Sequence, residues 1–386
     1  QWRHVPSQTS GHGLPPDTHK SRERDFWLAA IAKELEGLVA LNTWTMILRS
    51  RMPTGATLLR CHFVFSVKRN SDGSIDKFKA RLVADGNSQK AGVDFERVFS
   101  TVVKAQTIRL ALIIATVHDW NVTSIDIRQA YLQAELDVPL YMAPPPGVPS
   151  RDDRGRMLVC QLRRSLYGLR QAGRAWSTLF AHFLVSWGFV RSAIDVCLFT
   201  YAAQSALLWV LIWVDDAIII DNDPALRARF VADLGRRFPT EDKGELQWIL
   251  GIAITRDRAA RSMTLSLALY VSDLIDRFAS YMGALSRTYD TPFPEGRSLF
   301  PADCPSVDTP EHADMQPFRA TYMSIVGGLM WIATMVDCTL SFAVAQLARN
   351  LSNPSKLCWE SALRVLRYAQ THSSTLVFSP DTARGL

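Results

Sequence analysis

The fold of this chain is decided by residues 207–220, which read LLWVLIWVDDAIII. Two apolar runs flank the adjacent acids Asp215 and Asp216, a pattern that predicts a β-hairpin over Ser205–Val214 and Ala217–Asp221 with the acids at its tip. Two carboxylates side by side against an apolar sheet repel each other, and each is costly to keep charged without a cation. A plain turn is the alternative interpretation, because Asp tolerates the unusual backbone angles of turns.

A third carboxylate favours a functional interpretation. Asp126 lies in the segment TSIDI at residues 123–127, at the end of a strand predicted over Asn121–Ile127 and directly before a helix. If this strand neighbours the hairpin in one sheet, the three acids converge. Three such carboxylates can hold two Mg²⁺ ions ~3.5–4 Å apart, an arrangement used for in-line phosphoryl transfer. The sequence brings no His and Cys cluster to them, which favours Mg²⁺ over zinc.

The composition is that of a globular protein. The chain has 386 residues, 48% apolar and 21% charged, enough for two or three core-forming units. Its longest uninterrupted apolar run, Ala206–Val214, is far shorter than the ~20 residues of a membrane-spanning helix, and no secretion signal precedes it. The six cysteines are scattered without a C-x-x-C pair, which argues for reduced thiols. We therefore expect neither a secreted nor a membrane protein.

Positive charge is concentrated in two segments. Residues 49–81 carry eight cations against two acids, and residues 151–174 carry seven arginines against two acids, in a chain with a net charge of +6. Such patches fit a polyanionic partner such as nucleic acid, because neutralising phosphates releases counterions. A solvated surface in an arginine-rich chain is the alternative, since Arg outnumbers Lys 34 to 9.

Strands and helices intermix early in the chain and its end is mainly helical, which predicts an α+β body with a helical appendage. Residues 1–20 are rich in Pro, Gly, His and Ser, and we expect them to form a mobile lead-in. A hairpin is predicted from Leu58–Val67 and Ile75–Ala84, with Asn70–Gly73 as its turn. Helices are predicted at about residues 22–41, 107–119, 171–187, 224–237, 269–282, 319–350 and 355–371.

A series of short motifs occurs in the order typical of one family. They are residues 41–44 (LNTW), 79–84 (KARLVA), 125–127 (IDI), 130–132 (AYL), 165–172 (SLYGLRQA), 214–216 (VDD), 248–251 (WILG) and 324–329 (SIVGGL). On these motifs the chain resembles the reverse transcriptase of copia-type (Pseudoviridae) long-terminal-repeat retrotransposons over most of its length. The resemblance implies an RNA-directed DNA polymerase, a nucleotidyltransferase that extends a DNA primer on an RNA or DNA template.

The resemblance also implies a right-hand polymerase fold, an α+β architecture with fingers, a palm built on an antiparallel sheet, and a helical thumb. The expected ranges are 1–21 for a disordered linker, 22–105 for the fingers, 106–260 for the palm with a second fingers segment at about 140–175, 261–372 for the thumb, and 373–386 for the start of a connection. In the family an RNase H domain follows this connection. We expect no RNase H, protease or integrase activity in this chain.

By resemblance, Asp126, Asp215 and Asp216 are the catalytic acids and the metal ligands, and the backbone carbonyl of Ile127 is a further ligand. The implied cofactor is a pair of Mg²⁺ ions, with Mn²⁺ as a substitute. One ion would lower the pKa of the primer 3′-hydroxyl, and the other would steady the triphosphate and the leaving pyrophosphate. No protein general base is then required.

Nucleotide-binding residues follow from pattern and resemblance together. Lys77, Lys79 and Arg81 alternate along a predicted strand and therefore share one face. A row of cations suits an incoming triphosphate, and the resemblance assigns this role to Lys79 and Arg81. A solvated strand face is the alternative.

Further pocket residues come from the resemblance alone. Tyr131 stands where the family has an aromatic that closes the sugar pocket and excludes a ribose 2′-hydroxyl; a core aromatic is the alternative. The residues expected to line the pocket for the incoming base and template are Tyr167, Gly168 and Gln171, and those expected to hold the primer end are Trp248, Leu250 and Gly251.

The implied partners are an RNA template, a DNA primer and deoxynucleoside triphosphates, without a membrane. Contacts to the template are expected mainly at phosphates, because a polymerase must accept any sequence. Other polyprotein modules, an integrase upstream and an RNase H downstream, are expected outside this chain. The implied location is cytoplasmic, in a virus-like particle, or alternatively nuclear.

Several positions depart from the family pattern. Trp213 stands where a Tyr is usual, and Gly173 replaces a Pro. Asp85–Asn87 (DGN) replaces Lys-Gly-Phe, and Val336–Cys338 (VDC) replaces Arg-Pro-Asp. The alternative function is therefore a decayed, catalytically weak or inactive nucleic-acid-binding remnant. An RNA polymerase with a similar palm is disfavoured by Tyr131.

Overall fold

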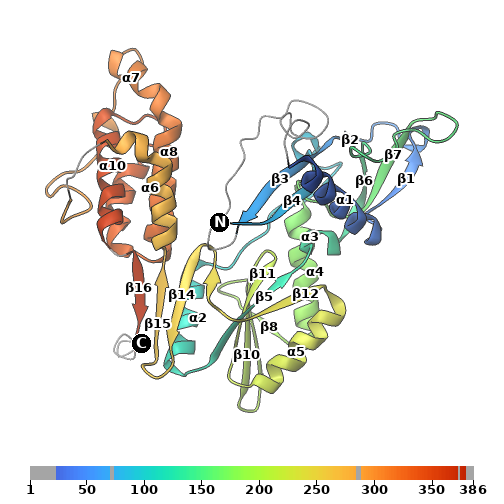
Figure 1. Ribbon diagram of the computed structural model, residues 1–386, viewed down its shortest axis with the longest axis horizontal. Helices are drawn as coiled ribbons and strands as arrows, with labels where there is room; N and C mark the ends of the chain where they lie inside the picture. Colours follow the sequence, from blue (N-terminus) through green and yellow to red (C-terminus); the bar gives the residue numbers. More distant parts are fainter. Residues whose placement is uncertain (1–22, 70–73, 284–287, 373, 380–386) are drawn as a thin grey trace. The chain divides into compact units, whose positions relative to one another are not determined.

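The computed structural model describes residues 23–69, 74–283, 288–372 and 374–379, and it divides into two compact units (Figure 1). Unit 1 comprises the chain up to Lys104 together with Thr123–Gly244. Unit 2 comprises Ala105–Val122 together with the chain from Glu245 onward. The predicted linker at 1–21 and the predicted turn at Asn70–Gly73 lie outside the described residues.

Unit 1 mixes helices with two sheets and a separate hairpin. Its helices are α1 (Arg24–Ala40), α3 (Ala130–Gln133), α4 (Ala172–Trp187) and α5 (Pro224–Arg237), with 3₁₀ turns at Arg49–Arg51 and Gly86–Ser88. Its strands are β1 (Trp44–Leu48), β2 (Leu58–Leu59), β3 (Cys61–Arg69), β4 (Ile75–Ala84), β5 (Asn121–Ile127), β6 (Glu135–Met142), β7 (Leu158–Arg164), β8 (Val190–Arg191), β9 (Leu198–Ala203), β10 (Ala206–Trp213), β11 (Asp216–Asp221) and β12 (Thr240–Glu245). The sheet orders are β12-β5-β11-β10-β9-β8 and β1-β7-β6-β2, and β3 pairs with β4.

The predicted acid-tipped hairpin is the centre of the six-stranded sheet. Its strands β10 and β11 are antiparallel, and the last pair in register joins Trp213 to Asp216. The strand β5, predicted over the same residues that form it, is hydrogen-bonded to β11 in this sheet. Five of the six residues of β11 and half of those of β10 are buried, in keeping with their apolar runs, and α5 packs against both strands. Figure 1 shows β5, β11 and β10 lying side by side.

The other part of unit 1 is organised around one apolar core. Helix α1 packs on β4, where Phe26 stacks on Phe78 and Trp27 meets the same ring edge-on. Leu38 of α1 and Leu82 of β4 are fully buried in this core. Period-two alternation along β4 therefore places its apolar side chains inward and leaves Lys77, Lys79 and Arg81 on the opposite face, as predicted.

Unit 2 combines helices with a four-stranded sheet of order β13-β14-β15-β16. Its helices are α2 (Ala105–Val117), α6 (Ala268–Met282), α7 (Pro310–Met315), α8 (Arg319–Met335), α9 (Ser341–Ala348) and α10 (Lys356–Thr371), with 3₁₀ turns at Pro301–Asp303, Gln316–Phe318 and Cys338–Leu340. Its strands are β13 (Trp248–Ile249), β14 (Ile252–Asp257), β15 (Ser262–Ser266) and β16 (Thr375–Phe378).

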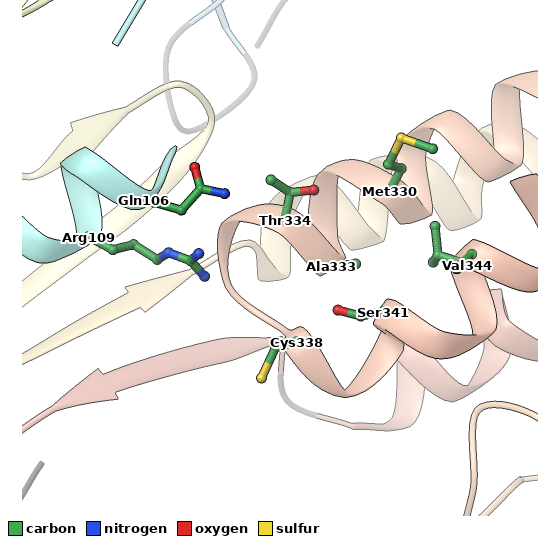
Figure 2. A pocket seen from close by; sticks show the side chains of 9 residues that line it. Gln106, Arg109, Met330, Ala333, Thr334, Cys338, Ser341 and Val344 are labelled. Carbon is green, nitrogen blue, oxygen red and sulfur yellow. The ribbon is translucent and has the colours of Figure 1, made fainter. Parts of the chain in front are cut away.

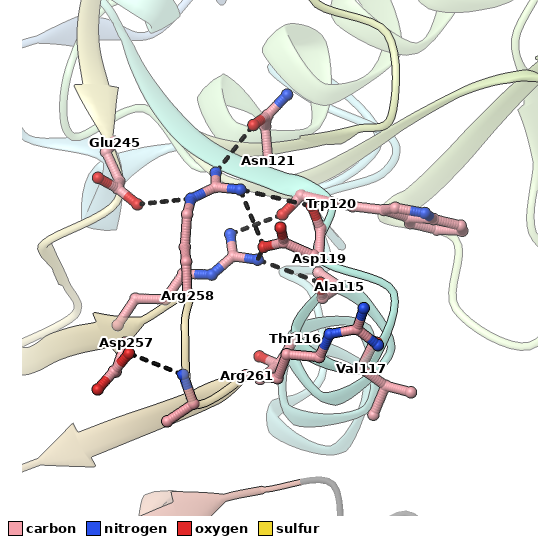
Figure 3. Close-up of polar contacts among 12 residues, drawn as sticks. Ala115, Thr116, Val117, Asp119, Trp120, Asn121, Glu245, Asp257, Arg258 and Arg261 are labelled. Carbon is pink, nitrogen blue, oxygen red and sulfur yellow. Dashed lines mark hydrogen bonds and ion pairs between the residues drawn. The ribbon is translucent and has the colours of Figure 1, made fainter.

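An arginine cluster on the β14–β15 hairpin fastens the end of α2 and the start of β5 (Figure 3). The side chain of Arg256 is only 5% exposed and donates to the carbonyl oxygens of Trp120 (2.6 Å) and Ala115 (3.3 Å). Arg256 and Arg258 both bind the Asp119 carboxylate at 3.0 Å. Since the last carbonyls of a helix lack intrahelical partners and carry partial negative charge, guanidinium groups there stabilise the corner.

Two predicted elements are divided in the structure. The helix predicted over 319–350 is broken into α8 and α9, because Val336 leaves the helical region and the Asp337 side chain accepts hydrogen bonds from Thr339. The strand predicted over Leu58–Val67 is split at Arg60: β2 pairs with β6, and β3 pairs with β4. The other predicted helices are confirmed. No helix among the described residues combines the length and apolar character needed to cross a membrane.

Candidate active site

The three predicted acids gather at one end of the six-stranded sheet in unit 1. Asp126 is on β5, Asp216 is the first residue of β11, and Asp215 lies in the turn that joins β10 to β11. The backbone N–H of Ile127 donates to the carbonyl oxygen of Asp215 at 2.8 Å. This bond fixes the backbone beside Asp126 against the acid-bearing turn.

The turn itself is strained and is held from a second side. Val214 has φ = +57°, a left-handed conformation that is unfavourable for a β-branched residue. Its carbonyl oxygen accepts a 2.7 Å hydrogen bond from Nε1 of Trp176, a buried residue of α4. Trp176 stacks on Phe180, so the donor is fixed by the aromatic core. The strain therefore persists because bonds from α4 and β5 over-determine the turn.

Negative charge is crowded at this end of the sheet. Burial raises the pKa of the Asp216 carboxyl, and the charges of Asp215 and Asp126 raise it further. Lys243 opposes this shift. The site therefore carries three carboxylates that repel one another, and among the described residues Lys243 is the cation that acts on Asp216.

Lys243 of β12 was missed by sequence reasoning. Its ammonium lies 3.5 Å from Oδ1 of Asp126 and 3.8 Å from Oδ1 of Asp216. Strand β12 neighbours β5, so Lys243, Asp126 and Asp216 stand on three consecutive strands of the sheet. One sequence signal was available: in an arginine-rich chain, Lys243 is the single lysine between Lys104 and Lys356.

The donor atoms suit a hard divalent cation, because every carboxylate and carbonyl at the site offers oxygen. The side chains are not arranged around an ion, however. Across the described part of the chain, no three His, Cys, Asp or Glu side chains lie close enough to hold a metal ion. The residues thus fit Mg²⁺ in ligand type, and an ammonium stands between two of them.

Two tyrosines and an arginine form the neighbouring wall in unit 1. The rings of Tyr131 on α3 and Tyr167 are 5.4 Å apart, and the Arg81 guanidinium lies 5.3 Å from the centre of the Tyr167 ring. Burial raises the pKa of Tyr167 to about 12, so its hydroxyl stays protonated at neutral pH. Burial and the charge of Asp215 raise the pKa of Tyr131. This electrostatic coupling places the tyrosine wall beside the acids.

The comparisons with known proteins bear on this geometry. A family model described as reverse transcriptase (RNA-dependent DNA polymerase) matches residues 41–289, a range that contains the three acids, Lys243 and the tyrosine wall. The chain belongs to this family. It is 33% identical over 347 residues to the retrovirus-related Pol polyprotein from transposon TNT 1-94 of Nicotiana tabacum. The matched stretch covers 90% of this chain and 25% of that protein.

Two further relatives are also transposon proteins. The Pol polyprotein from transposon RE1 of Arabidopsis thaliana is 34% identical over 89% of this chain and 22% of its own length. The putative transposon Ty5-1 protein of Saccharomyces cerevisiae is 28% identical over 65% of this chain and 76% of its own length. The chain thus spans about a quarter of the length of the plant polyproteins that it matches.

Within this reverse transcriptase domain, the backbone at Gly168 requires a glycine. It has φ = +88°, and a Cβ added there would lie 2.1 Å from the carbonyl oxygen of Ala84. The N–H of Ala84 in turn donates to the carbonyl oxygen of Tyr167 at 2.8 Å. The close approach therefore fastens the Tyr167 loop to the end of β4, the strand that carries Lys79 and Arg81.

Gln171 has a structural role in the reverse transcriptase domain that the sequence did not indicate. Its Nε2 donates to the carbonyl oxygen of Asp94, and its Oε1 accepts from Nε2 of Gln89, both at 3.0 Å. Both polar atoms of this amide have protein partners. A role for Gln171 in nucleotide binding stays a prediction.

Lys79 and Arg81 have an acidic neighbour. Glu34 of α1 accepts a hydrogen bond from the N–H of Leu82 at 3.1 Å. Burial raises the pKa of Glu34, while the Leu82 bond and the charges of Lys79 and Arg81 lower it. The cation row therefore has a structural interaction with α1 in addition to its predicted interaction with a triphosphate.

The predicted primer residues lie in unit 2, on the β13–β14 hairpin. Leu250 (φ = +54°) and Gly251 (φ = +84°) form its turn, and Trp248 is 47% exposed. A tight turn flanked by an exposed indole is compatible with contact to a nucleic acid strand. Their role in primer binding stays a prediction.

Two departures from the family pattern are accommodated locally. The Asp85 carboxylate lies 2.8 Å from Nδ1 of His62, so an imidazole faces the acid that replaces a lysine. A Cβ at Gly173 would lie 3.2 Å from the Cβ of Ser100, which makes glycine the easiest residue to fit there.

Unit 2 contains a cavity of about 390 Å³ between α2 and the α8–α9 corner (Figure 2). Arg109 of α2 lies across it from Thr334 of α8, with Cys338 and Ser341 on a third side. The sequence predicted none of these as site residues. The lining mixes one guanidinium, one amide, one thiol and two hydroxyls with apolar side chains, and none of the residues that line it carries a carboxylate.

Proposed function

We propose that this chain is the RNA-directed DNA polymerase domain of a retrotransposon polyprotein, extending a DNA primer on an RNA or DNA template. The observation that carries this proposal is the gathering of Asp126, Asp215 and Asp216 on neighbouring strands, within a chain of the reverse transcriptase family. The catalytic residues are these three acids. The reaction is attack of the primer 3′-hydroxyl on the α-phosphate of a deoxynucleoside triphosphate, with pyrophosphate leaving.

The acids and the carbonyl oxygen of Ile127 would hold two Mg²⁺ ions, with Mn²⁺ as a substitute. When bound, such ions supply activation of the 3′-hydroxyl and neutralise charge on the triphosphate and pyrophosphate. The excess of carboxylates at the sheet end supports this assignment, because burial and like charge make the cluster costly without cations. The chain's own part is to hold these oxygens in place through the Ile127 and Trp176 hydrogen bonds.

Lys79 and Arg81 bind the triphosphate of the incoming nucleotide. Tyr131 closes the sugar pocket and excludes a ribose 2′-hydroxyl, and Tyr167, Gly168 and Gln171 line the pocket for the base and template. The proximity of Tyr131, Tyr167 and Arg81, together with the effect of Asp215 on the pKa of Tyr131, supports this assignment. The planar guanidinium of an arginine such as Arg81 offers several donors in a fork that suits phosphate oxygens.

The domain has the right-hand polymerase organisation. The fingers comprise residues 22–105 and about 140–175, the palm 106–260 and the thumb 261–372, with 373–386 beginning a connection. The six-stranded sheet built around the antiparallel β10–β11 pair supports the palm assignment. Trp248, Leu250 and Gly251 hold the primer end.

The domain works as part of a larger polyprotein. Its relatives are Pol polyproteins of which it spans about a quarter, which supports an integrase upstream and an RNase H downstream in the whole protein. The template is RNA or DNA, the primer is DNA, and the place of action is a cytoplasmic virus-like particle or, alternatively, the nucleus.

Primer extension tests the proposal. The chain is incubated with an RNA template, a labelled DNA primer, deoxynucleotides and Mg²⁺, beside Asp215→Asn and the matched control Asp153→Asn, which changes an exposed loop acid. We expect extension by the unchanged chain and the control, and loss of at least about 10³-fold with Asp215→Asn. Duplex binding without extension by the unchanged chain would instead support the inactive remnant.

A further inference from the structure

Lys243 has no part in the chemistry proposed above, yet it is the residue in ion-pair contact with two of the three acids. Its Nζ lies 3.5 Å from Asp126 and 3.8 Å from Asp216. Both distances exceed those of a well-formed charged hydrogen bond, which are about 2.7–2.9 Å. The ammonium is therefore shared loosely between two carboxylates and is not tightly bound to either.

The position of Lys243 is imposed by strand β12. Asp242, its neighbour, is bound by Arg227 of α5 at 2.7 Å and accepts from the N–H of Gly244 at 3.0 Å. Arg227 also donates to Oγ1 of Thr123 on β5, so α5 ties β5 to β12. Because side chains alternate along a strand, anchoring Asp242 toward α5 turns Lys243 toward the other face of the sheet. Asp126 and Asp216 lie within its reach there.

The charges explain why a cation is favoured at this place. Burial and the charges of Asp215 and Asp126 raise the pKa of Asp216, and Lys243 counteracts them. The Lys243 side chain is 45% exposed, and its flexible stem can carry the ammonium into water without a large loss of burial. Lys243 can therefore leave the cluster when another cation enters.

We propose that the Lys243 ammonium is the internal counter-ion of the metal-free acid cluster, and that it competes with divalent cations for the oxygens of Asp126 and Asp216. Lys243 then sets the metal concentration at which the site fills. It also holds Asp126 and Asp216 together before metal and nucleotide bind. This inference rests on the proposed function, because it takes the cluster to be the metal site.

The test measures binding of Mn²⁺ alone to the whole chain, without nucleic acid, from the loss of the electron paramagnetic resonance signal of free Mn²⁺. The variants are Lys243→Met, which keeps the length of the side chain and removes its charge, and Lys243→Arg, which keeps the charge. Arg236→Met is the matched control, because it removes an exposed cation of α5 in the same unit. Circular dichroism establishes that each variant is folded.

We expect Lys243→Met to bind Mn²⁺ about tenfold more tightly than the unchanged chain, since a unit charge about 4 Å away opposes the ion. Lys243→Arg and Arg236→Met should stay within about twofold of the unchanged chain, because the first keeps the local charge and the second changes only distant charge. The melting temperature in EDTA gives a second readout. Lys243→Met should melt lower than the unchanged chain, and Mn²⁺ should abolish that difference.

Equal Mn²⁺ affinity of the unchanged chain and Lys243→Met would overturn the inference, and so would equal tightening in Arg236→Met. Either result leaves the proposed function intact, provided that Asp126→Asn abolishes the binding. Mn²⁺ binding that Asp126→Asn does not reduce would contradict the metal site itself. The two failures are therefore distinguishable in one set of titrations.

Discussion

Two charged clusters in this molecule are built in opposite ways. In the arginine cluster of unit 2, Arg256 and Arg258 both lie 3.0 Å from the Asp119 carboxylate. Arg256 also donates a 2.6 Å hydrogen bond to the carbonyl oxygen of Trp120. The acid cluster of unit 1 holds three carboxylates against one lysine, whose ion pairs are 3.5 and 3.8 Å long. Charges that are closely hydrogen-bonded stabilise a corner of the fold. Charges that are unmatched and loosely paired leave a site ready for a ligand.

The largest expected effect comes from Asp126→Asn in the acid cluster. Primer extension should fall by at least about 10³-fold, because one ligand of the metal site is lost. The melting temperature in EDTA should change by less than about 2 °C, since relief of repulsion from the neighbouring acids offsets loss of the Lys243 contact. Extension rates test the predicted loss of activity, and thermal melts test the predicted small change in melting temperature. If Asp126→Asn unfolded the chain, the acid cluster would be stabilising the fold as the arginine cluster does, and the difference between the two clusters would be contradicted.

Arg256→Met tests the other side of the comparison. The Arg256 side chain is nearly fully buried, and its loss leaves the carbonyls of Trp120 and Ala115 without these donors and Asp119 without one of its cations. We expect the free energy of unfolding to fall by about 3 kcal/mol. Urea denaturation measures it. The control is Arg261→Met, which removes a 3.4 Å bond to the carbonyl oxygen of Val117 and should cost less than about 1 kcal/mol.

The smallest expected effect is that of Trp176→Phe, which removes the donor to the Val214 carbonyl and keeps an aromatic ring in the core. We expect a loss of about 1–2 kcal/mol in the free energy of unfolding. The strained turn should also relax, so that primer extension slows while the melting temperature falls only slightly. Trp209→Phe on β10 is the matched control. Equal slowing by both variants would show that the turn does not depend on Trp176.

Much of the acid cluster could be predicted because its signals are local. The apolar runs beside Asp215 and Asp216 define the β10–β11 hairpin, and β5 reads as a strand that ends near Asp126. What brings these strands together is pairing between β5 and β11, and the motif order of one family was needed to expect it.

The place of Lys243 in the sheet was missed because strand β12 has the sequence TEDKGE, with no apolar alternation to indicate a strand. Its strand conformation comes from pairing with β5 and from the Arg227 bonds, which are long-range contacts. The break between α8 and α9 was missed for a related reason. Apolar helical periodicity continues on both sides of Asp337, and only the side-chain hydrogen bonds of that residue interrupt it.

Anomalous scattering from crystals of the chain grown with Mn²⁺, a primer–template duplex and an incoming deoxynucleotide would locate the divalent ions directly. The result predicted is Mn²⁺ bound by Asp126, Asp215 and Asp216, with the Lys243 ammonium displaced from between Asp126 and Asp216. Mn²⁺ bound elsewhere on the chain, with Asp126 and Asp216 still paired to Lys243, would contradict the assignment of this sheet end as the catalytic centre.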